Sequence, residues 1–119
     1  FQLRCLFVVT AIALTISPAQ AQITPAGDGF GTRVTSTPGQ FTIQGGSQVG
    51  SNLFHSFDQF GLQAGTRAVF ESRPVIRNIL ATVAGGQPSL INGQLQVTGG
   101  VSNLYLMNPA GIIFGSGAS

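Results

Sequence analysis

The amino-acid sequence predicts an all-β protein of at most one domain, and three observations lead to that class. The 119 residues include 17 glycines and six prolines, a composition that suits many turns. Short segments that alternate apolar and polar side chains lie between these turn residues. The hydrophobic fraction of 43% provides enough apolar side chains for a packed core, which argues against a solvated, disordered chain.

The first strands are expected at residues 32–37 and 41–44. Residues 32–37 are rich in Thr and Val, which have high β propensity, and Pro38 and Gly39 then form a turn dipeptide. Residues 41–44 alternate apolar and polar side chains before two successive glycines.

Residues 52–60 form the first distinctive stretch. Its apolar side chains are Leu53, Phe54, Phe57 and Phe60. Their spacing fits one face of a short helix nearly as well as a bulged strand. We favour a strand, because the neighbouring segments are β-like and Gly50 and Gly61 bound the stretch closely. His55 has no second His, no Cys and no carboxylate pair near it, so we interpret it as a packed or surface histidine, not a metal ligand or a base.

Further strands are expected at 67–70, at 75–83 and at 94–98. Pro74 separates the first two, and the second is long, apolar and without a helix cap, which predicts a bent strand. Glycine, proline and Asn-Gly breaks follow it before residue 94.

Residues 103–115 read as a strand, a tight turn and a second strand. Leu104 and Leu106 alternate with other side chains, and the sequence Asn-Pro-Ala-Gly at 108–111 supplies turn chemistry at each position. Nothing in this stretch is a nucleophile, a base or a metal ligand, so it indicates architecture or a recognition surface. Six side chains are predicted to point into one shared core, namely Leu95, Val97, Leu104, Leu106, Ile112 and Phe114.

A loose internal repeat runs through the chain. The pattern of a β-branched residue, any residue and two glycines occurs at 43–46, 83–86 and 97–100, and Ser-Asn-Leu occurs at 51–53 and 102–104. The unequal spacing excludes a fixed-period array. Toward the end of the chain a short strand recurs every eight to ten residues. This spacing suits either a β-sandwich or a solenoid whose coil contains two or three short strands.

The first 21 residues are predicted to be a secretory signal. Arg4 precedes an apolar run at 5–16, and Ala-Gln-Ala at 19–21 has the form of a cleavage site, so Gln22 would begin the mature chain. The run is shorter than the roughly 20 residues of a transmembrane helix. The alternative, a buried N-terminal helix, is weaker because Ser-Pro at 17–18 ends the run. Cys5 lies inside the signal, so the mature chain at 22–119 would form no disulfide.

The charged residues argue against several functions. Residues 22–119 carry four scattered arginines, which form no basic patch for nucleic acid. The three acids, Asp28, Asp58 and Glu71, lie far apart in sequence, whereas polysaccharide-cleaving sites need clustered carboxylates. We therefore predict no enzyme activity, no cofactor and no metal site.

Two stretches carry a family resemblance. Residues 52–60 (Asn-Leu-Phe-His-Ser-Phe-Asp-Gln-Phe) and 108–115 (Asn-Pro-Ala-Gly-Ile-Ile-Phe-Gly) resemble the N-terminal secretion domain of filamentous haemagglutinin-like exoproteins, the passengers of two-partner secretion. Pieces at 83–86, 91–93 and 99–104 also look like that family, so the similarity covers nearly all of 27–119. The family pattern at the turn is Asn-Pro-Asn-Gly-Ile, whereas this chain has Ala110 at the third position. Ala fits a central turn position but removes a side-chain amide.

The resemblance implies a right-handed parallel β-helix, or solenoid, with an N-terminal β cap. It implies a targeting function: the domain would be recognised in the periplasm of a Gram-negative-type envelope by an outer-membrane β-barrel transporter, and the exoprotein would reach the surface or the medium. The residues expected to carry recognition are Asn52, Leu53, Phe54, His55, Phe57, Phe60, Asn108, Pro109, Gly111 and Ile112. We expect the secretion domain at 22–119 to be truncated at its C-terminal end and open to self-association. The alternatives are a glycan-binding or cell-binding module of the haemagglutinin type and, less favoured, a polysaccharide-cleaving β-helix.

Overall fold

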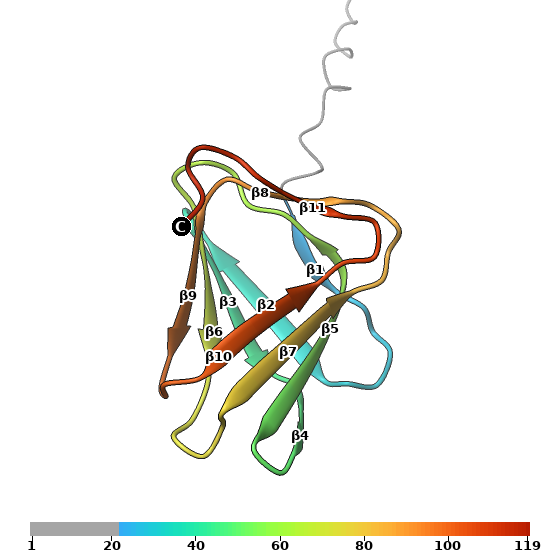
Figure 1. Ribbon diagram of the computed structural model, residues 1–119, viewed down its shortest axis with the longest axis vertical. Coiled ribbons are helices and arrows are strands. Elements are labelled where there is room, and N and C mark those ends of the chain that lie inside the picture. The colour runs from blue at the N-terminus through green and yellow to red at the C-terminus, as the bar shows by residue number, and fades with distance from the viewer. Residues whose placement is uncertain (1–21) are drawn as a thin grey trace, which may run out of the picture.

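The part of the chain that the structure describes is built from strands. The computed structural model describes residues 22–119, and within them it has eleven strands and no helix (Figure 1). The predicted signal at 1–21 lies outside the described residues. Residues 22–119 contain no candidate membrane-spanning helix. The predicted all-β class is therefore confirmed.

The strands form three sheets. The first contains, in spatial order, β1 (Ile23–Pro25), β5 (Asn52–Phe60), β7 (Asn78–Val83) and β10 (Asn103–Met107), with β4 (Ser47–Val49) also paired to β5. The second contains β2 (Thr32–Thr37), β3 (Gln40–Gly45), β6 (Arg67–Glu71) and β9 (Gln94–Thr98). The third contains β11 (Ile112–Phe114) and β8 (Ser89–Ile91).

Parallel pairing joins strands that lie in successive passes of the chain. One pass is the stretch of chain that runs once through the sheets, such as β7, β8 and β9. Strands β5, β7 and β10 are parallel neighbours, as are β3, β6 and β9, and as are β8 and β11. From β7 onward the chain visits the first, third and second sheets and then returns to the first and third (Figure 1). Each new strand therefore lies beside the strand that occupied the same sheet one pass earlier.

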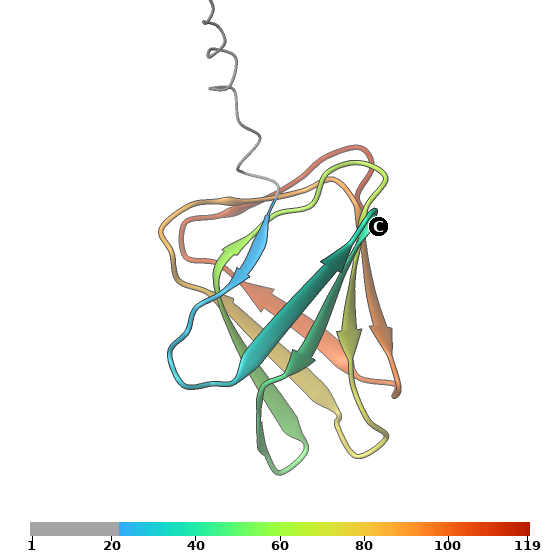
Figure 2. The ribbon, with the colours of Figure 1, turned by 180° about the vertical axis from the view of Figure 1, so that it is seen from behind.

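Antiparallel pairing is confined to the N-terminal strands. Strand β4 pairs with the beginning of β5 and β1 with its end, while β2 pairs with β3. Ser56 lies between the parts of β5 that pair with β4 and with β1. Its N donates to Thr32 Oγ1 at 3.0 Å, and its O accepts from Ala26 N at 3.1 Å. This edge of β5 is thus covered along its length. Figure 2 shows these N-terminal strands from behind, with β1 in blue and β2 in teal.

The core lies between the three sheets, and its buried hydrophobic residues all lie between Ile23 and Ile91. Phe57 and Phe70 are fully buried, and their ring centroids lie 6.2 Å apart in an edge-to-face arrangement. Of the six side chains predicted to share the core, five pack against it while partly buried: Leu95, Val97, Leu104, Leu106 and Ile112.

The prediction for Phe114 is wrong, because its side chain is 64% exposed. Phe114 is in register with Ile91, which is only 1% exposed, so the two residues share the inward direction. However, β11 pairs only with β8, so no further strand lies along its other edge.

Most predicted strand boundaries agree with the structure. Residues 52–60 form a strand and not a helix, and 32–37 and 94–98 match β2 and β9. The strand predicted at 75–83 begins only at Asn78, because Ile76 N donates to Arg73 O at 2.9 Å and closes a turn there. The three-residue strands β1, β4 and β8 were too short to be predicted from periodicity.

The Gly-Gly repeat marks places where one pass of the chain lies against another. A Cβ atom on Gly85 would lie 2.0 Å from the backbone oxygen of Asp58, and one on Gly100 would lie 2.5 Å from that of Arg73. Any larger residue would separate these backbones. The glycines therefore allow the corners of successive passes to stack closely.

Candidate recognition site

The first predicted motif is strand β5, and most of its side chains belong to the core. Leu53, His55, Phe57 and Phe60 are between 0% and 3% exposed. Because they point inward, a partner of the folded domain cannot contact them. Phe54 is half-buried and has the opposite direction in the strand, beside Leu80 of β7. Asn52 is also half-buried and accepts a hydrogen bond from Asn78.

His55 is a packed histidine, as predicted. Its Nδ1 lies 3.1 Å from Thr32 Oγ1, and its ring lies near the rings of Phe57 and Phe70 at centroid distances of 6.0 and 5.9 Å. Burial lowers the pKa of His55 from 6.5 to about 4, because the apolar surroundings disfavour the charged imidazolium. The Nε2 atom is buried with no hydrogen-bond partner. The neutral imidazole therefore joins the N-terminal strands to the core.

The second predicted motif is a turn fastened to the preceding pass of the chain. Asn108 Oδ1 accepts from Ala110 N at 2.9 Å, which is the expected bond from an Asn side chain to the backbone two residues on. Asn108 Nδ2 donates to Gln87 O at 2.8 Å and to Ser89 Oγ at 2.9 Å. Gly111 closes the turn with φ +111°, in the left-handed region. The Asn108 amide is thus used within the fold.

The side chains that the second motif does present are apolar. Pro109 and Ala110 are exposed at the turn, and Ile113 and Phe114 follow them at 56% and 64% exposure. Leu90, which is 40% exposed, is in register with Ile113 on the neighbouring strand. Ile112 and Phe114 point the other way, and Ile112 packs against the core. The motif therefore presents a small apolar surface, which we name the turn surface and define by Leu90, Pro109, Ala110 and Ile113.

Charge is distributed unevenly over the domain. The charged side chains of the described residues all lie between Asp28 and Arg77, so residues 78–119 have none. That uncharged part holds six of the nine exposed large hydrophobic residues found among the described residues. The turn surface therefore lies in a part of the molecule that resembles the uncharged centre of a protein interface.

The structure does not join the two motifs into one site. Asn108 directly follows β10, and β7 lies between β10 and β5 in the sheet (Figure 1). Instead, each motif has its own contacts: the first with the core and the N-terminal strands, and the second with residues 87–89. Thr32 and Ser89 were missed by the sequence reasoning, since no local pattern links them to partners about 20 residues away.

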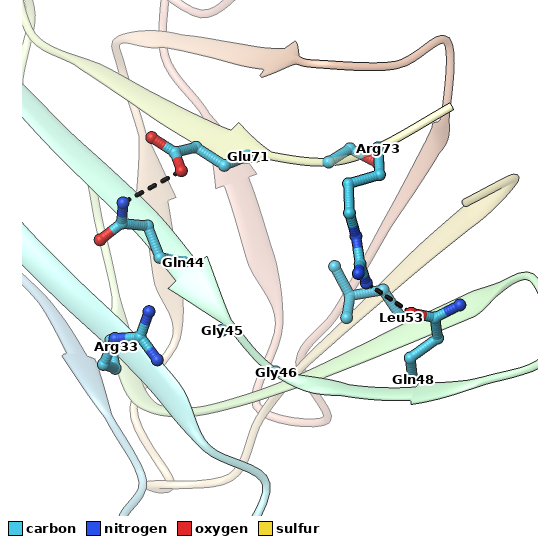
Figure 3. A pocket seen from close by; sticks show the side chains of 9 residues that line it. Arg33, Gln44, Gly45, Gly46, Gln48, Leu53, Glu71 and Arg73 are labelled. Atoms are coloured by element: carbon cyan, nitrogen blue, oxygen red, sulfur yellow. Dashed lines mark hydrogen bonds between the residues drawn. The ribbon is translucent and has the colours of Figure 1, made fainter. Parts of the chain in front are cut away.

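A polar groove near the N-terminal strands is a second feature that the sequence did not reveal. Its lining includes Arg33, Gln44, Gln48, Glu71 and Arg73, which come from four different segments (Figure 3). Gln44 Nε2 donates to Glu71 Oε1 at 3.0 Å, and Arg73 Nη2 donates to Gln48 Oε1. The described residues contain no cluster of three or more His, Cys, Asp or Glu side chains suited to a metal ion. The groove offers amides and guanidinium groups for binding.

Comparison with known proteins identifies the family. A family model described as the TPS secretion domain matches residues 21–119. No match was found among curated proteins or among solved structures. The match spans both motifs and every strand of the domain. This chain therefore belongs to the TPS secretion domain family and is a secretion domain of the two-partner type.

Proposed function

We propose that this domain is the N-terminal targeting part of a larger, adhesin-like exported protein. A signal at 1–21 would direct the chain across the inner membrane, and an outer-membrane β-barrel transporter would recognise the domain in the periplasm. The exported protein would then reach the cell surface or the medium. The observation that carries this proposal is the family match over residues 21–119.

We also propose that the domain begins a right-handed parallel β-helix, with β1, β2 and β4 as its N-terminal cap. Parallel neighbours in all three sheets support this architecture, because the sheets of a typical β-sandwich are antiparallel. Right-handed crossovers are the rule for parallel strands in one sheet. The antiparallel strands along the edge of β5 would act as a cap, because they occupy backbone groups that would otherwise be open to another chain.

The turn surface is the part of the second motif that we propose to contact the transporter. The core side chains of the first motif are inaccessible in the folded domain, and the Asn108 amide is used internally. Asn108 and Gly111 would therefore act by holding the turn, while Leu90 and Ile113 would provide apolar contact area.

Secretion assays can test the function and the contact surface separately. The exported protein would be expressed with and without its outer-membrane transporter, and the amount in the medium would be measured. We expect secretion to require the transporter and to fall in Ile113→Asn. Val101→Asn is the matched control, because Val101 is also a β-branched residue in the uncharged part and is fully exposed.

The outcomes distinguish two failures. Secretion that does not depend on the transporter would refute the targeting function. Transporter-dependent secretion with equal effects of Ile113→Asn and Val101→Asn would leave that function standing and refute the turn surface as the contact.

Glycan or cell-surface binding is the alternative that we carry forward. The polar groove is where this domain would bind a sugar, since amide and guanidinium groups can donate hydrogen bonds to hydroxyls. Glycan-array binding that is lost in Arg73→Ala, with secretion unchanged, would favour this function.

A further inference from the structure

Three asparagines form a ladder across the first sheet. Asn52, Asn78 and Asn103 are the first residues of β5, β7 and β10 and lie opposite one another in register. Asn78 Nδ2 donates to Asn52 Oδ1 at 3.0 Å, and Asn103 Nδ2 donates to Asn78 Oδ1 at 3.3 Å. The recurrence of Ser-Asn-Leu at 51–53 and 102–104 places the outer two members of this ladder.

The apolar side chains on the inward face of β5, β7 and β10 do not by themselves determine which residues of neighbouring strands lie opposite one another. A shift of one residue would turn every apolar side chain outward and is excluded by burial. A shift of two residues keeps the same face inward. In the structure Leu104 lies opposite Ile79, and after such a shift it would lie opposite Ala81, which also points into the core. Apolar burial alone therefore discriminates poorly between these two alignments.

The ladder does discriminate between them. After the two-residue shift, Asn103 would lie opposite the position of Leu80, and its amide would lose the acceptor on Asn78. Stacked amides of this kind satisfy each other only when the rungs are aligned.

We infer that the ladder of Asn52, Asn78 and Asn103 sets the register of the parallel strands by penalising the two-residue shift. Because β7 pairs with β5 and β10 pairs with β7, each later strand is aligned on one that precedes it in the chain. This order suits a chain that becomes available to fold from its N-terminus, a point that rests on the proposed secretion function. The selection of register itself does not depend on that function.

Engineered cysteine pairs report the alignment directly. Thr82 and Met107 are register partners with exposed side chains, so Thr82→Cys with Met107→Cys forms a disulfide only in the native alignment. Thr82→Cys with Tyr105→Cys forms one only after the two-residue shift. The single native cysteine, Cys5, is replaced by Ser in every variant. Each pair is made in a separate protein, which is refolded from urea with oxidised glutathione as the oxidant. The measured quantity is the yield of the shifted disulfide divided by the yield of the native disulfide.

Asn78→Ala removes both ladder bonds, and we expect it to raise the ratio by about tenfold, given the usual strength of such hydrogen bonds. Asn103→Ala removes one bond and should raise it less. The matched control is Asn92→Ala, which also loses a bond between passes of the chain, to Gly117 N at 2.8 Å, but lies outside this sheet. It should leave the ratio unchanged while reducing stability.

A variant that moves the ladder asparagine of β7 from position 78 to position 80 provides the strongest test. Asn78→Leu combined with Leu80→Asn places the amide where Asn103 would meet it after the shift. We expect the yield of the shifted disulfide then to exceed the yield of the native disulfide. The inference is overturned if this swap and Asn78→Ala leave the ratio as in the unaltered chain, or if Asn92→Ala raises it equally. If Asn78→Ala fails to refold, Asn103→Ala, at the edge of the sheet, still decides the question.

Discussion

Acidification should destabilise this domain through one side chain, His55. The imidazole is 2% exposed, and burial lowers its pKa from 6.5 to about 4. Between these two values the unfolded chain binds a proton that the folded chain does not. Stability is therefore complete above pH 6.5 and is lost as the pH falls toward 4.

The size of the loss follows from the two pKa values. Each pKa unit corresponds to about 1.4 kcal/mol, so lowering the pKa from 6.5 to about 4 costs about 3 kcal/mol of the free energy of unfolding by pH 4. About 2 kcal/mol of this should already be lost at pH 5. These values are large against the total stability of a small domain.

Urea unfolding at a series of pH values measures this loss, with His55→Leu as the control. Leucine has a similar volume and does not titrate, and the acidic side chains are common to both proteins. The difference between the two pH profiles therefore isolates the histidine, which is the one histidine in the sequence. Parallel profiles of the two proteins between pH 7 and 5 would refute the reasoning, since they would mean that the protonated imidazole is accommodated in the folded state.

Four further substitutions test the packing and the turn. Asn108→Ala should lower the free energy of unfolding by about 1 to 3 kcal/mol, because the turn loses its bonds to the preceding pass, and should reduce secretion, whereas Ala110→Asn should leave secretion equal or better. Gly85→Ala should cost about 1 to 3 kcal/mol in urea unfolding, since the new methyl group meets the backbone oxygen of Asp58. Phe57→Ala should cost about 3 to 5 kcal/mol by the same measurement, and a loss below 1 kcal/mol would contradict its central place in the core.

The candidate site was predicted from sequence only in part. The two motifs were found, and the turn bond from Asn108 Oδ1 to Ala110 N was expected from the turn chemistry. The sequence could not show that Leu53 and Phe57 point into the core while Phe54 points outward. Alternation assigns side chains to two faces, but the packing of other segments decides which face is buried. That decision separates the motif residues that are buried from those that are accessible.

Local chemistry by itself determined the fold class, most strand positions and the turn at 108–111. These depend on neighbouring residues in the chain: β propensity, alternation with a period of two, and the backbone preferences of Asn, Pro and Gly. Only the tertiary structure decided that β5, β7 and β10 are parallel neighbours, that the asparagines at their first positions form a ladder, and that Gly85 lies against Asp58. These features join residues about 25 positions apart, and their energy exists only once separate passes of the chain lie side by side. Phe114 shows both contributions. Its direction follows from the two-residue period of the strand, whereas its exposure follows from the position of β11 at the edge of its sheet.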